Sequence, residues 1–394
     1  MTEAPYVYPN DMHVAWSIMI VLYPYITGLV AGAFVVSALY HVFHQRALQP
    51  VARLALVTSL CFCAFATLPL LLHLHHPERA FNIVITPNRL SAMAGFGFIY
   101  AIYMLVLLIE VWLVFRPALA DKARGKTGIV AAVCRALSLG IERFDSGHAS
   151  GSAERDRPSS SRGHVSQASA IAMGSQRADA WMIRCLAIVG IPIACVLHGY
   201  VGFLFGAVKA NPWWSTALMP VIFLMSAIVS GIAALIALYV VASWWRGVRH
   251  DDQCLRALAQ YLWVFLVVAV ALELLELTQL AYESDGEWHV LKALITERLT
   301  VSYGLVQLLL GSLVPLVLLL LVFWQRVRGT GLTLVSLTAS VLVLVQVFAM
   351  RWNVVVGGQL FSKSFRGFVE FDLPWLGREG VVAAAVVLLL PLTA

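Results

Sequence analysis

Long runs of apolar residues, separated by short polar segments, follow one another from residue 14 to the end of the chain. Most runs hold roughly 20 residues or more, enough for a helix with a rise of 1.5 Å per residue to cross the ~30 Å hydrocarbon layer of a bilayer. The pattern predicts an all-α, polytopic transmembrane helical bundle of about nine helices, over residues 14–43, 51–74, 91–115, 181–207, 215–244, 257–282, 300–324, 331–350 and 379–394.

The ninth run is shorter than the others. From Gly380 to Ala394 it has 15 residues, which make only about 22 Å of helix. Such a helix crosses a bilayer only where the membrane thins, so we expect the native chain to continue beyond residue 394, with a truncated tenth helix as an alternative.

Composition agrees with a membrane location. Hydrophobic residues make up 60% of the chain, charged residues only 12%, and mean hydropathy is +0.83, which excludes a soluble globular protein. The net charge of +6 does not indicate nucleic acid as a partner, because the basic residues stand in short segments beside apolar runs. We expect membrane lipid to be the surrounding phase.

The distribution of Lys and Arg predicts the orientation of the helices. More of them follow the first, third, fifth and seventh helices than follow the alternate ones. By the positive-inside rule we expect a multi-pass protein of the bacterial inner membrane with a periplasmic N-terminus. The polar N-terminal residues lack the features of a signal peptide, so we expect the first helix to be retained. The segments expected to face outward are 75–90, 208–214, 283–299 and 351–378.

A polar stretch interrupts the apolar pattern. From Phe144 to Gln176 the chain is rich in Ser, Gly and Arg and almost lacks large apolar residues. Such a segment buries too little apolar surface to order itself, so we expect a flexible linker, with a docking or regulatory tail as the alternative. It divides the chain into a three-helix part at 1–120, a flexible cytoplasmic loop at 121–180 and a six-helix part at 181–394.

Two acidic residues occupy one face of the sixth predicted helix. Glu273 and Glu276 stand three residues apart, and an ionisable side chain inside a membrane is costly unless it is paired or hydrated. Two carboxylates on one stripe disfavour each other's ionisation, which suits proton transfer near neutral pH. The alternative is a structural ion pair of these acids with Arg298 or Arg351.

A third acid, Glu110, lies near the cytoplasmic end of the third predicted helix, beside Arg116. We expect these two side chains to form a salt bridge at the membrane boundary, because long charged side chains near a helix end reach toward the interface.

Histidines gather where the second helix is predicted to end, at His73, His75 and His76. A metal site is disfavoured, because His73 and His75 point to different sides of a helix end and no further Cys or His stands at partner spacing. The other histidines form no obvious facing pair for a haem, and we interpret the six cysteines as packing residues. We expect no bound metal or haem in this chain.

The first helix carries His13, Trp16 and Tyr23 along one face. Such a stripe, beginning at the outer interface, could line a slot for a flat ring with two carbonyl oxygens, such as a quinone. The alternative is the ordinary interfacial belt of Trp and Tyr. On the same helix, Gly28 and Gly32 have the spacing of a close contact with a neighbouring helix.

Three motifs stand in order along the chain: 73–82 with Asn88, His198-Gly199-Tyr200 leading to Asn211-Pro212-Trp213-Trp214, and Arg351-Trp352-Asn353 leading to Gly358-Gln359. The first two resemble segments of the polysulfide reductase membrane-subunit (NrfD/PsrC) family. The third is similar to the longer branch of that family, which includes HybB-type hydrogenase subunits, DsrP-like subunits and subunits of alternative complex III.

The resemblance implies an NrfD-like helical subunit that binds a quinone near the outer face, with menaquinone or ubiquinone as substrate. It also implies electron exchange with a periplasmic-side, ferredoxin-like iron–sulfur subunit docked on 75–90 and 351–378, and further catalytic or cytochrome subunits. Carried over by motif, the residues expected at the quinone are Trp16, Tyr23, His76, Arg79, His198 and Tyr200, with His76 and His198 as proton carriers in addition to Glu273 and Glu276.

One position departs from the family pattern. Many members of the family that this chain resembles have Glu in the seventh helix at the position of Gln307. A neutral amide does not carry protons by itself. Two other classes of function stay open. A secondary transporter would use the acids to bind substrate or protons, although no inverted repeat with broken helices is apparent. A purely structural anchor would hold a catalytic partner without any quinone requirement for His76 or Arg79.

Overall fold

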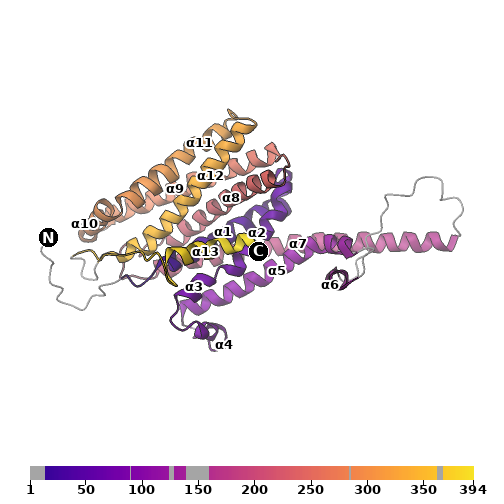
Figure 1. The fold of residues 1–394 in the computed structure, drawn as a ribbon, viewed down its shortest axis with the longest axis horizontal. Coiled ribbons are helices and arrows are strands. Elements are labelled where there is room, and N and C mark those ends of the chain that lie inside the picture. The colour runs from indigo at the N-terminus through magenta and orange to yellow at the C-terminus, as the bar shows by residue number, and fades with distance from the viewer. Residues whose placement is uncertain (1–13, 89, 124–127, 139–158, 284, 362–366) are drawn as a thin grey trace. The chain divides into compact units, whose positions relative to one another are not determined.

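A computed structural model of the chain describes residues 14–88, 90–123, 128–138, 159–283, 285–361 and 367–394 (Figure 1). Eight helical segments in this part of the chain are long and apolar enough to cross a membrane. In chain order they are built from α1 (Ile18–His41), α2 and α3 (Gln49–Phe65 and Leu68–His73), α5 (Ala92–Ala123), α7 (Ser159–Gly206), α8 (Met219–Trp245), α9 (Asp252–Glu283), the π-helix η4 followed by α11 (Thr300–Leu313 and Val314–Phe323), and α12 (Thr330–Val355).

Short helices connect or flank these segments. They are η1 (Arg46–Leu48), η2 (Pro77–Phe81), α4 (Asn82–Ile85), α6 (Ile129–Ser138), α10 (Asp285–Ala293), the π-helical η3 (Leu294–Arg298), η5 (Gly357–Gln359) and α13 (Val381–Thr393). The ninth predicted span corresponds to α13, whose 13 residues are fewer than a helix needs to cross a bilayer.

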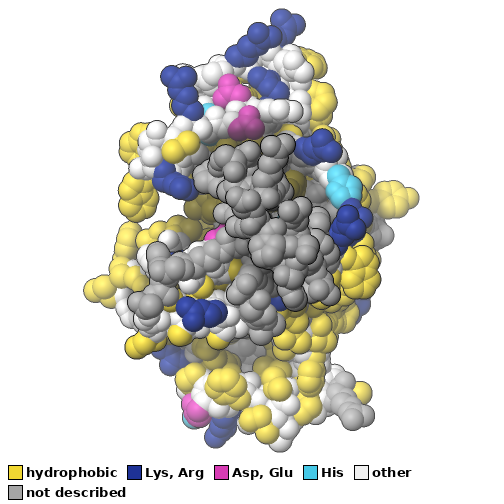
Figure 2. Space-filling view, turned by 90° about the vertical axis from the view of Figure 1, so that its right-hand side faces the viewer, with side chains coloured by type: hydrophobic (Ala, Val, Ile, Leu, Met, Phe, Trp, Pro, Cys, Tyr) yellow, Lys and Arg dark blue, Asp and Glu magenta, His cyan; other side chains and the backbone are white. Residues whose placement is uncertain are grey.

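The structure confirms an all-α, polytopic helical bundle. Many large apolar side chains remain exposed, as expected for helices surrounded by lipid. In Figure 2, Lys and Arg side chains are spread over the face turned to the viewer, and hydrophobic side chains lie at its edges. One basic residue is placed differently from the expectation. Arg351, grouped above with the outer segment 351–378, lies inside α12 and is buried, because the apolar helix continues past Met350.

The polar stretch before the fourth span also differs from the expectation. Helix α7 begins at Ser159, so part of the segment from Phe144 to Gln176 is helical, and residues 139–158 lie outside the described residues. Alanines at 168, 170 and 172 favour helix, and the helix continues without a break into the apolar span that begins at Arg177. The division at 120 and 180 stays a prediction. By their contacts the residues form two compact units, Met1–Met104 with Ile191–Ala394, and Leu105–Gly190.

The first unit is built on a close contact between α1 and α8. A Cβ atom at Gly32 would lie 2.3 Å from the carbonyl oxygen of Ala227, and one at Gly231 would lie 2.4 Å from the Cα atom of Gly32. The two backbones therefore touch, as small residues allow in membrane helices. The contact predicted from the spacing of Gly28 and Gly32 is confirmed, with α8 as its partner.

We expect Gly32→Ala to lower the thermal-unfolding midpoint of the purified protein in detergent, because the added methyl group meets backbone atoms and such overpacking costs about 1–3 kcal/mol. Gly304→Ala is the matched control, since a Cβ atom there meets nothing within 4 Å. The control should keep or raise the midpoint, because alanine is about 1 kcal/mol better than glycine within a helix. The readout is the monodisperse fraction after heating, and equal midpoints for the two variants would contradict the contact.

Candidate functional site

Two of the three sequence motifs meet at one end of the bundle. The segment 207–218, between α7 and α8, is bound to the C-terminal end of α12. Asn211 Nδ2 donates to the carbonyl of Gly358 at 2.7 Å, and the indole Nε1 of Trp213 donates to the carbonyl of Asn353 at 3.1 Å. Gly358 leaves room for a second indole, since a Cβ atom there would lie 2.2 Å from Trp214 Nε1. These buried contacts hold the connecting segment in place.

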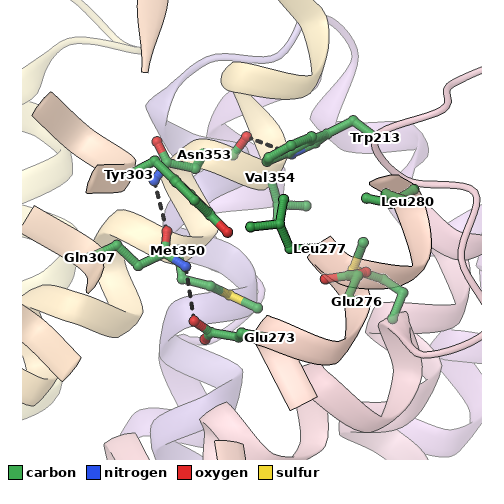
Figure 3. Close-up of a pocket in the computed structure, with 11 residues that line it drawn as sticks. Trp213, Glu273, Glu276, Leu277, Leu280, Tyr303, Gln307, Met350, Asn353 and Val354 are labelled. Carbon is green, nitrogen blue, oxygen red and sulfur yellow. Dashed lines mark hydrogen bonds between the residues drawn. The ribbon is translucent and has the colours of Figure 1, made fainter. Parts of the chain in front are cut away.

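A pocket lies beside this segment, among α9, η4 and α12 (Figure 3). The empty space enclosed by its lining is about 440 Å³, a volume that includes open solvent at the mouth of the pocket. The lining combines aromatic and aliphatic walls with carboxyl and amide groups, and consists of Trp213, Met219, Glu273, Glu276, Leu277, Leu280, Tyr303, Gln307, Met350, Asn353 and Val354.

Glu273 is buried, and both of its carboxyl oxygens accept hydrogen bonds from amides. Gln307 Nε2 donates to Oε2 and Gln346 Nε2 donates to Oε1, each at 3.1 Å. Gln307 in turn accepts a bond from Asn353 Nδ2 at 2.8 Å. Gln346 packs closely here, because a Cβ atom at Gly311 would lie 2.3 Å from the Cβ of Gln346. Gln307, the position that departs from the family pattern, therefore donates a hydrogen bond to the carboxyl group of Glu273.

Glu276 lines the same pocket without comparable support. It lies nearly one helical turn farther along α9, and its Oε1 atom is buried with no hydrogen-bond partner among the described residues. Its neighbours in the lining include the apolar side chains of Leu277 and Leu280 (Figure 3). The two acids predicted to share one helix face do share one pocket, but their surroundings differ.

Arg351 is fully buried in α12, at 0% exposure. Its guanidinium group donates to Ser226 Oγ at 2.6 Å, to the carbonyl of Phe223 at 3.2 Å and to His198 Nε2 at 3.1 Å. The guanidinium carbon also lies 3.7 Å from the centroid of the Phe223 ring. In the described part of the chain no carboxylate forms an ion pair with Arg351, and Glu273 is the acid that interacts with it electrostatically when ionised.

Trp16 reaches the same end of the bundle as Trp213. Its ring is stacked on that of Trp214, with centroids 5.0 Å apart and planes within 7°. Its backbone N–H donates to Gln359 Oε1 at 3.1 Å. Trp16 is therefore near the segment that carries Trp213, but it does not line the pocket. His13, predicted on the same face of this helix, lies outside the described residues.

Tyr23, His198 and Tyr200 belong to the first unit but do not line the pocket either. Tyr23 is buried, and its hydroxyl has no hydrogen-bond partner among the described residues. Tyr200 donates its hydroxyl to the carbonyl of Ala92 at 2.9 Å. His198 is connected to the pocket indirectly, through Arg351 and the charge of Glu273.

His76 and Arg79 lie at the surface, on and beside η2. The side chain of His76 is 61% exposed, and its Nδ1 atom is 3.0 Å from Glu78 Oε1. Its neighbour His73 instead contacts Glu379, which precedes α13, at 3.2 Å. The structure does not bring His76 or Arg79 to the pocket that holds the two acids.

Glu110 is placed differently from the expectation as well. It is fully buried, and neither carboxyl oxygen has a hydrogen-bond partner in the described part of the chain. Arg116 forms its ion pair with Asp179 instead, at 2.8 Å. The predicted salt bridge is wrong, because residues six apart on a helix lie on different sides of it.

Sequence reasoning singled out the acids of the pocket but not Gln346 or Tyr303, and it named Asn353 only as part of a motif. A signal for the amides was present, because an amide inside an apolar run needs a hydrogen-bond partner much as an acid does. Which partner it finds depends on contacts between distant helices. Among the described residues, no group of three or more His, Cys, Asp or Glu is placed to hold a metal ion.

Comparison with known proteins gives the family. The chain is 31% identical over 263 residues to a selenate reductase subunit of Mesobacillus selenatarsenatis, covering 66% of this chain and 56% of that protein. It therefore spans little more than half the length of that relative. It is 25% identical over 357 residues to protein NrfD of Escherichia coli, covering 88% and 95% of the two chains. The profile of the family described as polysulphide reductase, NrfD, matches residues 7–363, a range that includes every residue of the pocket, and this chain belongs to that family.

Proposed function

We propose that this chain is the quinone-reactive membrane subunit of a multisubunit oxidoreductase, and that it exchanges electrons between menaquinone or ubiquinone and an iron–sulfur subunit. The pocket beside Trp213 carries the proposal, because it combines aromatic walls, amide groups and two carboxyls inside a membrane-spanning bundle. Quinol oxidation releases two electrons and two protons. It therefore needs a slot for a flat ring, polar groups for the ring oxygens and a proton acceptor.

The residues of the pocket fit a quinone ring. Trp213 and Tyr303 meet edge to face, with ring centroids 6.0 Å apart, and Leu277 and Met350 add apolar walls. The hydroxyl group of Tyr303 points into the pocket (Figure 3). A hydroxyl donates and accepts hydrogen bonds, so it suits both the oxidised and the reduced form of a ring oxygen.

The two carboxyls have different roles in this proposal. Glu273 accepts two amide hydrogen bonds and, when ionised, balances the positive charge of Arg351, and these interactions offset part of the cost of burying the carboxylate. Protonating its Oε2 atom weakens the hydrogen bond that Gln307 Nε2 donates to it, because a neutral carboxyl is a poorer acceptor than a carboxylate. Oε1 of Glu276 has no hydrogen-bond partner among the described residues, so adding a proton to it breaks no such bond. With Arg351 and Glu273 both charged, the site is neutral when Glu276 is protonated. Glu276 is therefore the proton acceptor, and Glu273 is the fixed charge.

The expected orientation places the pocket on the outer side of the membrane. The segment 207–218 and the ends of α9 and α12 lie at the periplasmic end if the N-terminus is periplasmic, in a bacterial inner membrane. We place the iron–sulfur subunit on the outer segment 75–90 and on the part of 351–378 that follows α12, with catalytic or cytochrome subunits beyond it. A relative named as a selenate reductase subunit supports a reductase complex as the setting.

Glu276→Gln removes the proton acceptor with little change of shape. We expect quinone-linked turnover of the purified complex to fall about 100-fold or more, the usual contribution of a general acid or base, while assembly is unchanged. Glu276→Asp should retain part of the turnover, because a carboxyl group remains in the pocket. The measurement is quinone-linked activity per assembled complex, beside activity with a soluble artificial electron carrier.

Glu273→Gln is the matched variant one turn away. It should lower assembled yield or thermal stability, because it leaves the buried charge of Arg351 uncompensated, a class of change that costs roughly 3–5 kcal/mol. If Glu273→Gln and Glu276→Gln gave the same stability and the same turnover, the division of roles between the two acids would be wrong.

The same assay separates the pocket from the residues that the resemblance assigns. His76→Ala and Arg79→Ala change exposed side chains away from the pocket, so we expect quinone-linked turnover to stay within about twofold, as for most surface substitutions. A large loss of turnover in either variant, with normal assembly, would indicate that the quinone binds near η2. Normal turnover in both and in Glu276→Gln would instead favour a purely structural anchor.

A further inference from the structure

The short helix α6 carries an exposed apolar stripe. Ile129, Val130, Val133 and Leu137 are between 47% and 85% exposed. At about 100° per residue, these four positions fall within an arc of about 100° on the helix. Four exposed aliphatic side chains in one arc form a continuous apolar surface, unlike scattered apolar residues on a protein surface.

The other side of α6 fixes its position in the second unit. The small side chains of Ala131 and Ser138 are buried there. Trp112 Nε1 donates to the carbonyl of Leu137 at 2.9 Å, and Arg116 Nε donates to the carbonyl of Ser138 at 3.1 Å. These bonds satisfy carbonyl groups that have no partner within the helix. The C-terminal end of α6 is therefore held at the level of Trp112 and Arg116 on α5.

That level is where α5 leaves the hydrocarbon layer. Leu105, Leu108 and Ile109 are exposed, and Trp112 continues their stripe at the spacing of one helix face. Trp112 also follows Ala92, the first residue of α5, by 20 residues, which is about 30 Å of helix, the thickness of the hydrocarbon layer. Tryptophan is enriched at this boundary.

The exposed side chains of helix α7 indicate the same boundary of the hydrocarbon layer. Ile188 and Val189 are exposed, and Trp181 stands on the same face with 67% of its surface exposed. Two residues before it, Asp179 forms the ion pair with Arg116 at 2.8 Å. On both helices an exposed apolar stripe ends at a tryptophan, and a shared ion pair follows on the polar side.

We propose that α6 lies in the headgroup layer of the bilayer, with its apolar stripe inserted among phospholipids beside the lipid-facing surfaces of α5 and α7. The lipid already surrounding α5 extends without interruption to Leu137. Helices that lie in the interface combine one apolar face with basic residues nearby. Among the described residues, basic side chains outnumber acidic ones at this end of the unit, which favours anionic phospholipid: Arg116, Lys122, Arg135, Arg177 and Arg184 against Glu110, Asp121 and Asp179.

Photocrosslinking tests the proposal directly. A benzoylphenylalanine residue is introduced at Val130 or Val133, with Ala132 and Arg135 as control positions outside the arc. The assembled complex is illuminated in phosphatidylethanolamine vesicles with or without phosphatidylglycerol, and adducts are identified by mass spectrometry. We expect phospholipid adducts several-fold more abundant at 130 and 133 than at the controls, and enriched in phosphatidylglycerol where it is present.

Adducts to another protein at 130 and 133, or equal phospholipid yields at the control positions, would overturn the insertion. Incorporation of the two lipids in proportion to their abundance would overturn the preference for anionic lipid. A second measurement does not depend on the crosslinker. Val133→Asp should speed hydrogen exchange of the α6 amides in vesicles, whereas Ala132→Asp should not, and equal exchange in the two variants would contradict the proposal.

Discussion

The buried positive charge of Arg351 is the constraint on which the rest of the site depends. A charge of this kind, left uncompensated in a membrane-spanning bundle, would destabilise it by several kcal/mol. A hydroxyl, a carbonyl, an imidazole and an aromatic face surround the guanidinium group, and none of these neutral groups supplies a negative charge. In the proposed function Glu273, on the neighbouring helix α9, supplies it when ionised. The amides of Gln307 and Gln346 then hold that carboxyl in place, so α7, α8, α9, η4 and α12 are linked through one set of polar contacts.

This arrangement explains why two acids three residues apart differ. Glu273 is matched by two donors and a cation, whereas Glu276 faces a pocket with apolar walls. A carboxyl group without fixed partners gains or loses a proton with little rearrangement, which is what the oxidation or reduction of a quinone demands. Trp213 also joins the pocket to the end of α12, so the proposed ring site and the proposed proton acceptor, Glu276, are held by the same set of contacts.

The membrane helices, a close helix contact at Gly28 and Gly32 and the shared face of the two acids could all be predicted, because each depends on local spacing and hydropathy. The partner of that contact, α8, could not be predicted, because the pairing joins distant parts of the chain. Arg351 could not be placed, since hydropathy alone assigns a basic residue at the end of an apolar run to a loop. Its partners, Ser226 and Phe223, are more than 100 residues away in the sequence. The resemblance to the family assigned His76 to the quinone site. It did not indicate that this side chain would lie at the surface.

The most direct test of the quinone pocket is to locate the ring itself. The assembled complex is labelled with a photoreactive azidoquinone, with and without excess unlabelled quinone, and the labelled peptides are mapped by mass spectrometry. The pocket predicts competable labelling of peptides that contain Trp213, Tyr303 or the segment 277–280. Competable labelling confined to peptides around His76 or Tyr200, or labelling that excess quinone does not reduce, would contradict it.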